Sequence, residues 1–106
     1  MKPDKILSML GIAAKANYIA SGEYQTEHAV KGYEAFLVIV AGDASDNTKK
    51  KFRNMCDFYE VPFEIYSDKD GLGRSVGKEF RSSIAITDEG LAKSILKKLA
   101  ATKTTE

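Results

Sequence analysis

Apolar residues recur along the chain at two spacings, one typical of amphipathic helices and one typical of strands. Helical spacing predicts helices at residues 4–16, from 21–22 to about 32, from 43–47 to 61, at 72–76, and from 87–89 through 99. Short apolar or alternating runs predict strands at residues 18–20, 36–41, 63–66 and 83–87. Because helices alternate with strands, we expect an α/β fold, a three-layer α/β/α sandwich around a small central mixed sheet of about four strands.

The same pattern predicts which residues form the core. The run from Phe36 to Ala41 is apolar throughout, as expected for a central strand covered on both faces. The inner face of the second helix would carry Thr26, Ala29 and Val30. Cys56 is the only cysteine, so no internal disulfide can form, and its apolar-periodic position indicates a small buried hydrophobe.

Length and composition predict one folded domain. A chain of 106 residues, 43% hydrophobic and 29% charged, is long enough for a single core. We assign residues 1–101 to this domain and expect a frayed tail at 102–106. No apolar stretch approaches the roughly 20 residues of a membrane-spanning helix, and no signal-peptide core follows the first residues, where Pro3 suits a helix start. We therefore expect a cytoplasmic protein that does not contact membranes. We also expect a monomer.

Candidate catalytic and metal chemistry is sparse. The chain has one histidine, His28, and one cysteine, too few for a zinc site from these side chains. The acid pairs Asp43/Asp46 and Asp88/Glu89 flank predicted helix starts and are interpreted as caps. The glycines of residues 71–77 have the wrong spacing and lie too late in the chain for a dinucleotide-binding loop. We expect neither an enzyme nor a cofactor or metal site.

Net charge gives little support to nucleic-acid binding. Sixteen basic and 15 acidic residues leave a formal charge of +1, so any RNA site must be local. The densest basic cluster, residues 49–53, is interpreted as the solvated face of a helix, with phosphate steering as its alternative role.

The turn at residues 21–26 has more specific chemistry. It combines a helix N-terminus, a glycine that lets the backbone approach a ligand, and the side chains of Gln25 and Thr26. Backbone N–H groups at such a turn can bind phosphate, and glutamine can pair with base edges. From the chemistry alone, an ordinary capped helix start is the leading interpretation of this segment.

Five segments, in order, resemble the ribosomal L-seven-Ae superfamily and, within it, the bacterial YlxQ-like branch. The resemblance extends over about residues 4–99. It rests on LGIA at 10–13, SGEYQT at 21–26, LVIVAGDAS at 37–45, LGRSVG at 72–77 and IAITDEG at 84–90. It implies an α/β/α protein without catalytic activity that binds kink-turn RNA, as a ribosomal-protein-like component of ribonucleoproteins.

The resemblance also implies site residues. Gly22, Gln25 and Thr26 match the family's RNA-binding turn, whereas Tyr24 stands where members carry lysine or asparagine, and His28 replaces a phosphate-binding lysine with a weaker, pH-dependent cation. The loop before the last strand would place Phe80 where it can stack on an extruded base. The full expected set is Lys15, Gly22, Glu23, Tyr24, Gln25, Thr26, His28, Lys31, Arg74, Lys78, Phe80 and Arg81.

Two other functions remain as alternatives. A protein-interaction module that kept the fold but lost RNA affinity would account for Tyr24, His28 and the near-neutral charge. A small-molecule or nucleotide-binding enzyme would need a set of titratable groups that this sequence does not contain.

Overall fold

The computed structural model describes residues 4–104 and contains one mixed sheet of four strands in the order β1-β4-β2-β3. These are β1 (Ile19–Ser21), β2 (Leu37–Val40), β3 (Phe63–Ile65) and β4 (Ser83–Ile86). The last strand in sequence, β4, lies between β1 and β2 and is antiparallel to both, whereas β2 and β3 are parallel. The sheet is therefore completed only by the C-terminal part of the chain.

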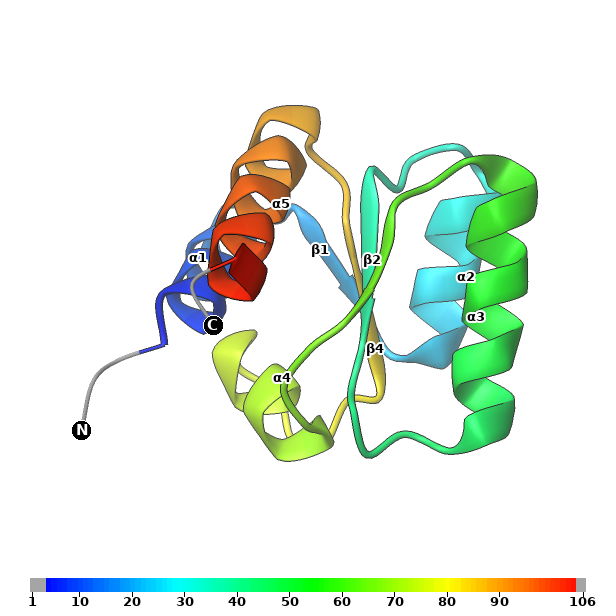
Figure 1. Ribbon diagram of the computed structural model, residues 1–106, viewed down its shortest axis with the longest axis horizontal. Coiled ribbons are helices and arrows are strands. Elements are labelled where there is room, and N and C mark those ends of the chain that lie inside the picture. Colours follow the sequence, from blue (N-terminus) through cyan, green and yellow to red (C-terminus); the bar gives the residue numbers. More distant parts are fainter. Residues whose placement is uncertain (1–3, 105–106) are drawn as a thin grey trace.

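Helices cover both faces of this sheet (Figure 1). On one face lie α1 (Lys5–Lys15), α4 (Lys69–Ser75) and α5 (Glu89–Thr104), and on the other lie α2 (Glu23–Lys31) and α3 (Asp46–Tyr59). This arrangement confirms the predicted α/β/α sandwich with four strands. Within residues 4–104, no helix is long and apolar enough to cross a membrane.

The core forms where the helices pack on β2 and β4. Every residue of both strands is buried, as expected for a sheet covered on its two faces. Thr26, Ala29 and Val30 are buried on the inner face of α2, as predicted. Cys56 is buried as well, and its burial raises the pKa of the thiol to about 11, so the sulfur stays protonated and serves as a small apolar group.

Side-chain caps fix the helix starts and correct two details of the prediction. Asp68 accepts a hydrogen bond from Gly71 N–H at 2.7 Å, so α4 begins at Lys69, three residues before the predicted start at residue 72. Contrary to the prediction, Asp43 does not cap α3. Its Oδ1 accepts from Lys69 N–H at 2.8 Å and so joins the end of β2 to the first turn of α4.

The remaining caps agree with the predicted positions. Ser45 caps α3 by accepting from Thr48 N–H, and Asp46 is the acid of the first turn. Asp88 accepts from Leu91 N–H at the start of α5. Pro3 and residues 105–106 of the expected tail lie outside the described residues, whereas 102–104 are the last residues of α5.

Candidate functional site

A groove lies between the start of α2 and the loop that enters β4. Both segments are at the same end of the sheet (Figure 1). The groove has a volume of about 460 Å³ and is lined by Ser21, Gly22, Glu23, Tyr24, Gln25, Phe80, Arg81 and Ser82. Residues 21–25 and 80–82, far apart in sequence, therefore form one surface. This surface contains all four site residues expected from Gly22 to Gln25, together with Phe80 and Arg81 of the later loop.

Gly22 gives the groove its backbone geometry. Its φ of 95° and ψ of 160° are accessible in practice only to glycine. The N–H group of Gly22 donates to the Ser83 carbonyl at 2.9 Å, which ties the turn to β4. The side chains of Asp4, Ser45 and Asp68 cap α1, α3 and α4 with a hydrogen bond. Glycine has no side chain, so α2 begins without such a bond. The first-turn N–H groups of α2 are thus left to other acceptors.

Two buried hydroxyl groups hold this turn from below. The Thr26 hydroxyl donates to the Gly22 carbonyl at 2.7 Å, and the Ser83 hydroxyl donates to Thr26 Oγ1 at 3.0 Å. Thr26 and Ser83 are both fully buried, so the side chain of Thr26 offers no surface to a ligand. The expected site residue Thr26 therefore shapes the groove from inside rather than lining it.

Arg81 lies over Gly22 and places a positive charge in the groove. Its Cδ is the atom nearest to where a Cβ on Gly22 would be, at 3.8 Å. Its Nε donates to Ser21 Oγ at 3.4 Å, and its Nη1 donates to the carbonyl of Phe80 at 2.8 Å. The side chain is half-buried, and these contacts restrict its position.

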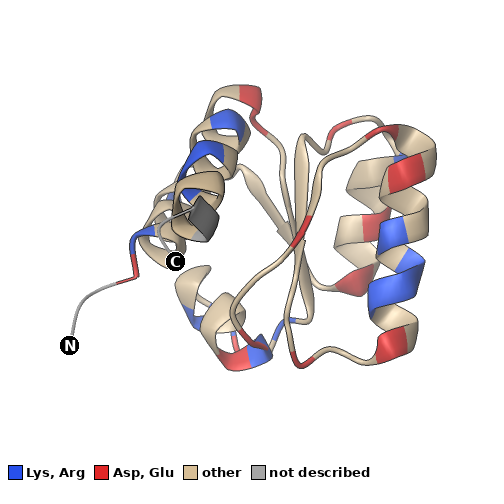
Figure 2. Ribbon diagram, viewed as in Figure 1, with Lys and Arg blue, Asp and Glu red and all other residues tan. Residues whose placement is uncertain are grey.

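The groove also contains a carboxylate. Glu23 Oε2 accepts from Ser82 Oγ and from Thr48 Oγ1, each at 3.4 Å, and so links α2 to the β4 loop and to the start of α3. Figure 2 shows acidic and basic residues interspersed over the helices, in keeping with the net charge of +1. The groove is therefore mixed in charge rather than a basic patch.

The loop that carries Phe80 and Arg81 is packed against α4 at a glycine. A Cβ at Gly73 would overlap the carbonyl group of Glu79, so only glycine fits there. Lys78 N–H donates to the Gly73 carbonyl at 2.8 Å, and Arg81 N–H donates to the Lys69 carbonyl at 3.0 Å. This close approach explains a glycine in the segment that superficially resembled a dinucleotide loop.

Two aromatic side chains extend from the groove into solvent. Tyr24 is 75% exposed and Phe80 is 67% exposed. Phe80 is thus exposed beside Gly22, which confirms its predicted position; its stacking role stays a prediction. The Tyr24 ring also lies near the ring of His28, with centroids 6.1 Å apart.

The remaining expected cations lie outside the groove. His28 and Lys31 line a hollow further along α2, and Lys78 lines a hollow beside Ser21. Lys31 donates to Glu27 Oε2 at 2.7 Å. Glu27 also pairs with Lys51 at 2.9 Å, which links α2 to α3. Hydrogen bonds from Lys31 and then from Lys51 lower the pKa of Glu27 to about 2.

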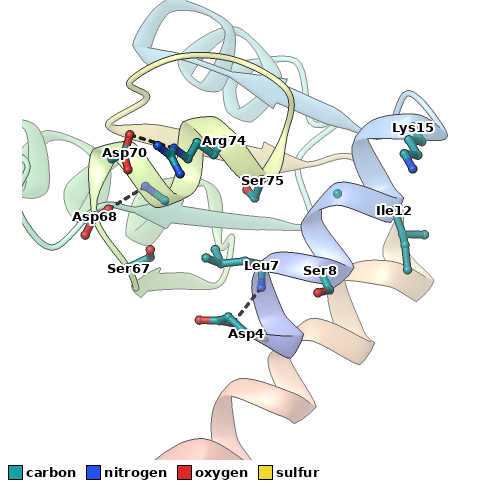
Figure 3. Close-up of a pocket in the computed structure, with 12 residues that line it drawn as sticks. Asp4, Leu7, Ser8, Ile12, Lys15, Ser67, Asp68, Asp70, Arg74 and Ser75 are labelled. Atoms are coloured by element: carbon teal, nitrogen blue, oxygen red, sulfur yellow. Dashed lines mark hydrogen bonds and ion pairs between the residues drawn. The ribbon is translucent and has the colours of Figure 1, made fainter. Parts of the chain in front are cut away.

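Lys15 and Arg74 line a larger hollow between α1 and α4, with a volume of about 780 Å³ (Figure 3). Three aspartates, Asp4, Asp68 and Asp70, also line it, and Arg74 Nε lies 3.4 Å from Asp70 Oδ1. Lys15 lies at the end of α1 away from Asp4 (Figure 3). The structure thus separates these two cations from the groove at Gly22.

Sequence reasoning missed the hydroxyl groups that build the groove. Ser21 and Ser82 line it, Ser83 supports Thr26, and Thr48 orients Glu23. The pairing of β1 with β4 brings Ser21 opposite Ile84, the residue after Ser83. That pairing cannot be read from the sequence of either strand alone.

Comparisons with known proteins agree over nearly the whole chain. A model of the ribosomal protein L7Ae/L30e/S12e/Gadd45 family matches residues 4–96. The RNA-binding protein YlxQ of Bacillus subtilis (strain 168) is 39% identical over 88 residues, which cover 83% of this chain and 88% of that protein. The RNA-binding protein YlxQ of Enterococcus faecium is 38% identical over 90 residues, covering 84% and 85%.

Solved structures show the same fold. A protein of unknown function from Bacillus halodurans has a TM-score of 0.86 and 36% identity, over 90% of this chain and 96% of that one. The 15.5kD RNA binding protein of Giardia lamblia has a TM-score of 0.78 over 95% of this chain and 92% of that one, and its 22% identity supports likeness of fold alone.

Proposed function

Because this chain belongs to the ribosomal protein L7Ae/L30e/S12e/Gadd45 family, we propose that it binds structured RNA, preferably a kink-turn, through the groove at Gly22. Family membership agrees with the resemblance predicted from the sequence. The observation that carries the proposal is the uncapped start of α2, flanked by Gln25, Arg81 and two exposed aromatic rings. The relatives' names support RNA as the ligand, and they name no catalytic activity, in keeping with the prediction of a protein that is not an enzyme.

Phosphate binding follows from the charge at the start of α2. The free N–H groups and the helix dipole favour an anion there, and Arg81 adds a full positive charge beside Gly22. The missing side chain of Gly22 lets an RNA backbone approach. A kink-turn brings phosphates together across its bend, so a protein with donors at one point stabilises the bent form over the open form.

Base recognition falls to the exposed side chains. Gln25 is exposed in the first turn of α2 and can pair with purine edges through its amide. Phe80 and Tyr24 offer rings on which unpaired bases stack. Glu23 repels phosphate, so the RNA groups near it are donors such as 2′-hydroxyls or base amino groups.

The other expected residues have different roles. Thr26 positions the turn from beneath the surface. Lys78 flanks the groove and adds nearby positive charge, and His28 flanks it with an imidazole that can hydrogen-bond to RNA. The last three, Lys15, Lys31 and Arg74, contact only an RNA that extends beyond the groove, because two line the α1–α4 hollow and Lys31 is paired with Glu27.

A gel-shift titration with Gln25→Ala tests this proposal. The RNAs are a folded kink-turn and a straight duplex of equal length, each with and without a divalent ion. We expect the wild type to prefer the kink-turn, and the variant to lose about 1–3 kcal/mol of affinity while its stability changes by less than about 0.5 kcal/mol. Asn54→Ala, which removes an exposed amide from α3, is the matched control and should bind normally.

Each other outcome has a defined meaning. Equal binding to both RNAs would contradict kink-turn preference while leaving RNA binding intact. Unchanged affinity of the Gln25 variant would contradict base reading by this residue. Binding to neither RNA would favour the protein-interaction module, the alternative that Tyr24 and the near-neutral charge support.

A further inference from the structure

Three aromatic side chains meet at the end of α2 and α3 opposite the groove. This aromatic cluster consists of Tyr33, Phe58 and Tyr59. The Tyr33 and Tyr59 ring centroids are 5.5 Å apart, those of Phe58 and Tyr59 are 5.0 Å apart, and both pairs meet edge to face. Tyr33 and Phe58 are each 77% exposed, among the most exposed large hydrophobic side chains of the described residues.

The backbone holds Tyr33 in this position at a cost. Tyr33 has a φ of 59°, in the left-handed region that glycine or asparagine adopts with less strain. The residue follows Gly32 at the end of α2, and its N–H donates to the Val30 carbonyl at 3.1 Å. Asn17 and Glu60 have the same left-handed conformation at the ends of α1 and α3, so this geometry is an ordinary way to end a helix. At Tyr33 it directs an exposed ring towards Tyr59 of α3.

The charges beside the cluster are negative. Glu34, Asp57 and Glu60 are exposed and adjoin the aromatic residues in sequence. Figure 2 shows acidic residues at this end of α3. The C-termini of α2 and α3 also lie here, where the helix dipoles add partial negative charge. Lys31, which lies near Tyr59, shares the single carboxylate of Glu27 with Lys51, so one positive charge is left against the three acids.

We propose that the aromatic cluster docks a short segment of another protein that carries apolar side chains flanked by lysine or arginine. Apolar side chains would cover the rings, and the basic groups would complement the acids and the helix ends. With both rings 77% exposed, the two offer on the order of 300 Å². This area suits a short segment rather than a standard interface of about 800 Å² per partner.

Two other occupants are disfavoured by the same charges. RNA bases could stack on the rings, but the phosphates would face carboxylates and helix C-termini. A second copy bound symmetrically would bring Glu34, Asp57 and Glu60 against themselves. The cluster is separated from Gly22 by the length of α2, about 14 Å for its nine residues, so RNA and the protein segment can bind together.

Selection of peptides from a phage-displayed library of random twelve-residue sequences tests the proposal. The targets are the wild type, the double variant Tyr33→Asn/Phe58→Ser, and the control Tyr24→Ser/Phe80→Ser, which removes two similarly exposed rings from the groove. Asparagine keeps the left-handed backbone at residue 33, so this variant should fold, which circular dichroism would verify. A single Phe58→Ser variant provides a second reading if the double variant unfolds.

We expect the wild type and the control to enrich peptides that combine apolar and basic residues. Synthetic copies of these peptides should bind the cluster variants at least tenfold more weakly than the wild type. Saturating kink-turn RNA should leave peptide binding unchanged. Enrichment of no common pattern, or of acidic peptides, would overturn the proposal, as would equal binding to the cluster variants. So would wild-type dimers that dissociate in these variants, or RNA crosslinks to Tyr33 or Phe58. Peptide selection needs no RNA, so its result is independent of the proposed RNA function.

Discussion

Gly22→Ala tests whether the backbone of the groove depends on glycine. At φ 95° and ψ 160°, an alanine is strained by about 1–3 kcal/mol. The strain cannot relax easily, because the N–H of residue 22 is bound to Ser83 and its carbonyl accepts from both Thr26 N–H and the Thr26 hydroxyl. A direct clash adds little, since the nearest atom to the new Cβ is Arg81 Cδ at 3.8 Å. We expect a loss of about 2 kcal/mol in the free energy of unfolding.

The measurements are urea denaturation and affinity for a kink-turn RNA. A loss of about 2 kcal/mol corresponds to a decrease in melting temperature of roughly 10 °C for a domain of this size. RNA affinity should decrease at least tenfold, because the Cβ occupies the place of closest approach and the turn shifts. Gly90→Ala is the matched control: Gly90 has ordinary backbone angles in α5, and this change should leave stability unchanged or slightly higher.

Either of two results would refute this reasoning. A Gly22 variant as stable as the wild type would show that the turn relaxes without strain. A destabilised variant that binds RNA with wild-type affinity would show that the turn lies outside the binding site.

Three further predictions concern side chains at the surface. Tyr24→Lys should tighten kink-turn binding and steepen its salt dependence by at most about one phosphate contact; titrations at two salt concentrations measure this, and looser binding would show that Tyr24 stacks on a base. Phe80→Ala should lose about 1–3 kcal/mol of RNA affinity with melting temperature unchanged, whereas a large decrease in melting temperature would mean that the ring packs in the fold. Glu27→Gln should lower stability at pH 7 by less than about 1 kcal/mol, since the pairs with Lys31 and Lys51 are solvent-accessible. The pKa of Glu27 is lowered in the folded protein, so its stabilisation is present above about pH 4.5 and is lost as the pH falls towards 2. Urea denaturation of the wild type and the variant at several pH values measures this, and a difference between their midpoints that does not change with pH would contradict it.

The sequence predicted the fold well because each hydrophobic pattern lies within a single helix or strand. The apolar run at residues 36–41 and the alternation at 63–66 each identified a strand without knowledge of its partner. The sequence also identified Ser67 and Asp68 as capping residues of α4, and the structure shows Asp68 in that role, but the helix start was placed too late because Lys69 and Asp70 are polar and Leu72 is the first apolar residue of the helix.

The candidate site was predictable only in part. Gly22 and Gln25 belong to one recognisable segment, and the family resemblance linked them to Phe80. The position of Arg81 over Gly22 and the pairing of Thr26 with Ser83 arise from contacts across about sixty residues of sequence, and no local pattern encodes them. The pairing of Arg74 with Asp70, by contrast, is a local i,i+4 contact within α4, and it was missed because the predicted helix began only at residue 72.

The central place of β4 affects the order in which the protein can fold. Before residues 83–86 are available, β1 and β2 have no strand between them, and their unpaired edges are open to wrong pairing. Pairing β1 with β4 closes a loop that contains most of the chain, and this step is slow compared with forming the helices. The same event brings the Ser83 carbonyl to the Gly22 N–H and Arg81 to the turn. During synthesis, the nascent chain therefore cannot form the groove until β4 has left the ribosome. The ability to bind a ligand arises when the sheet is completed.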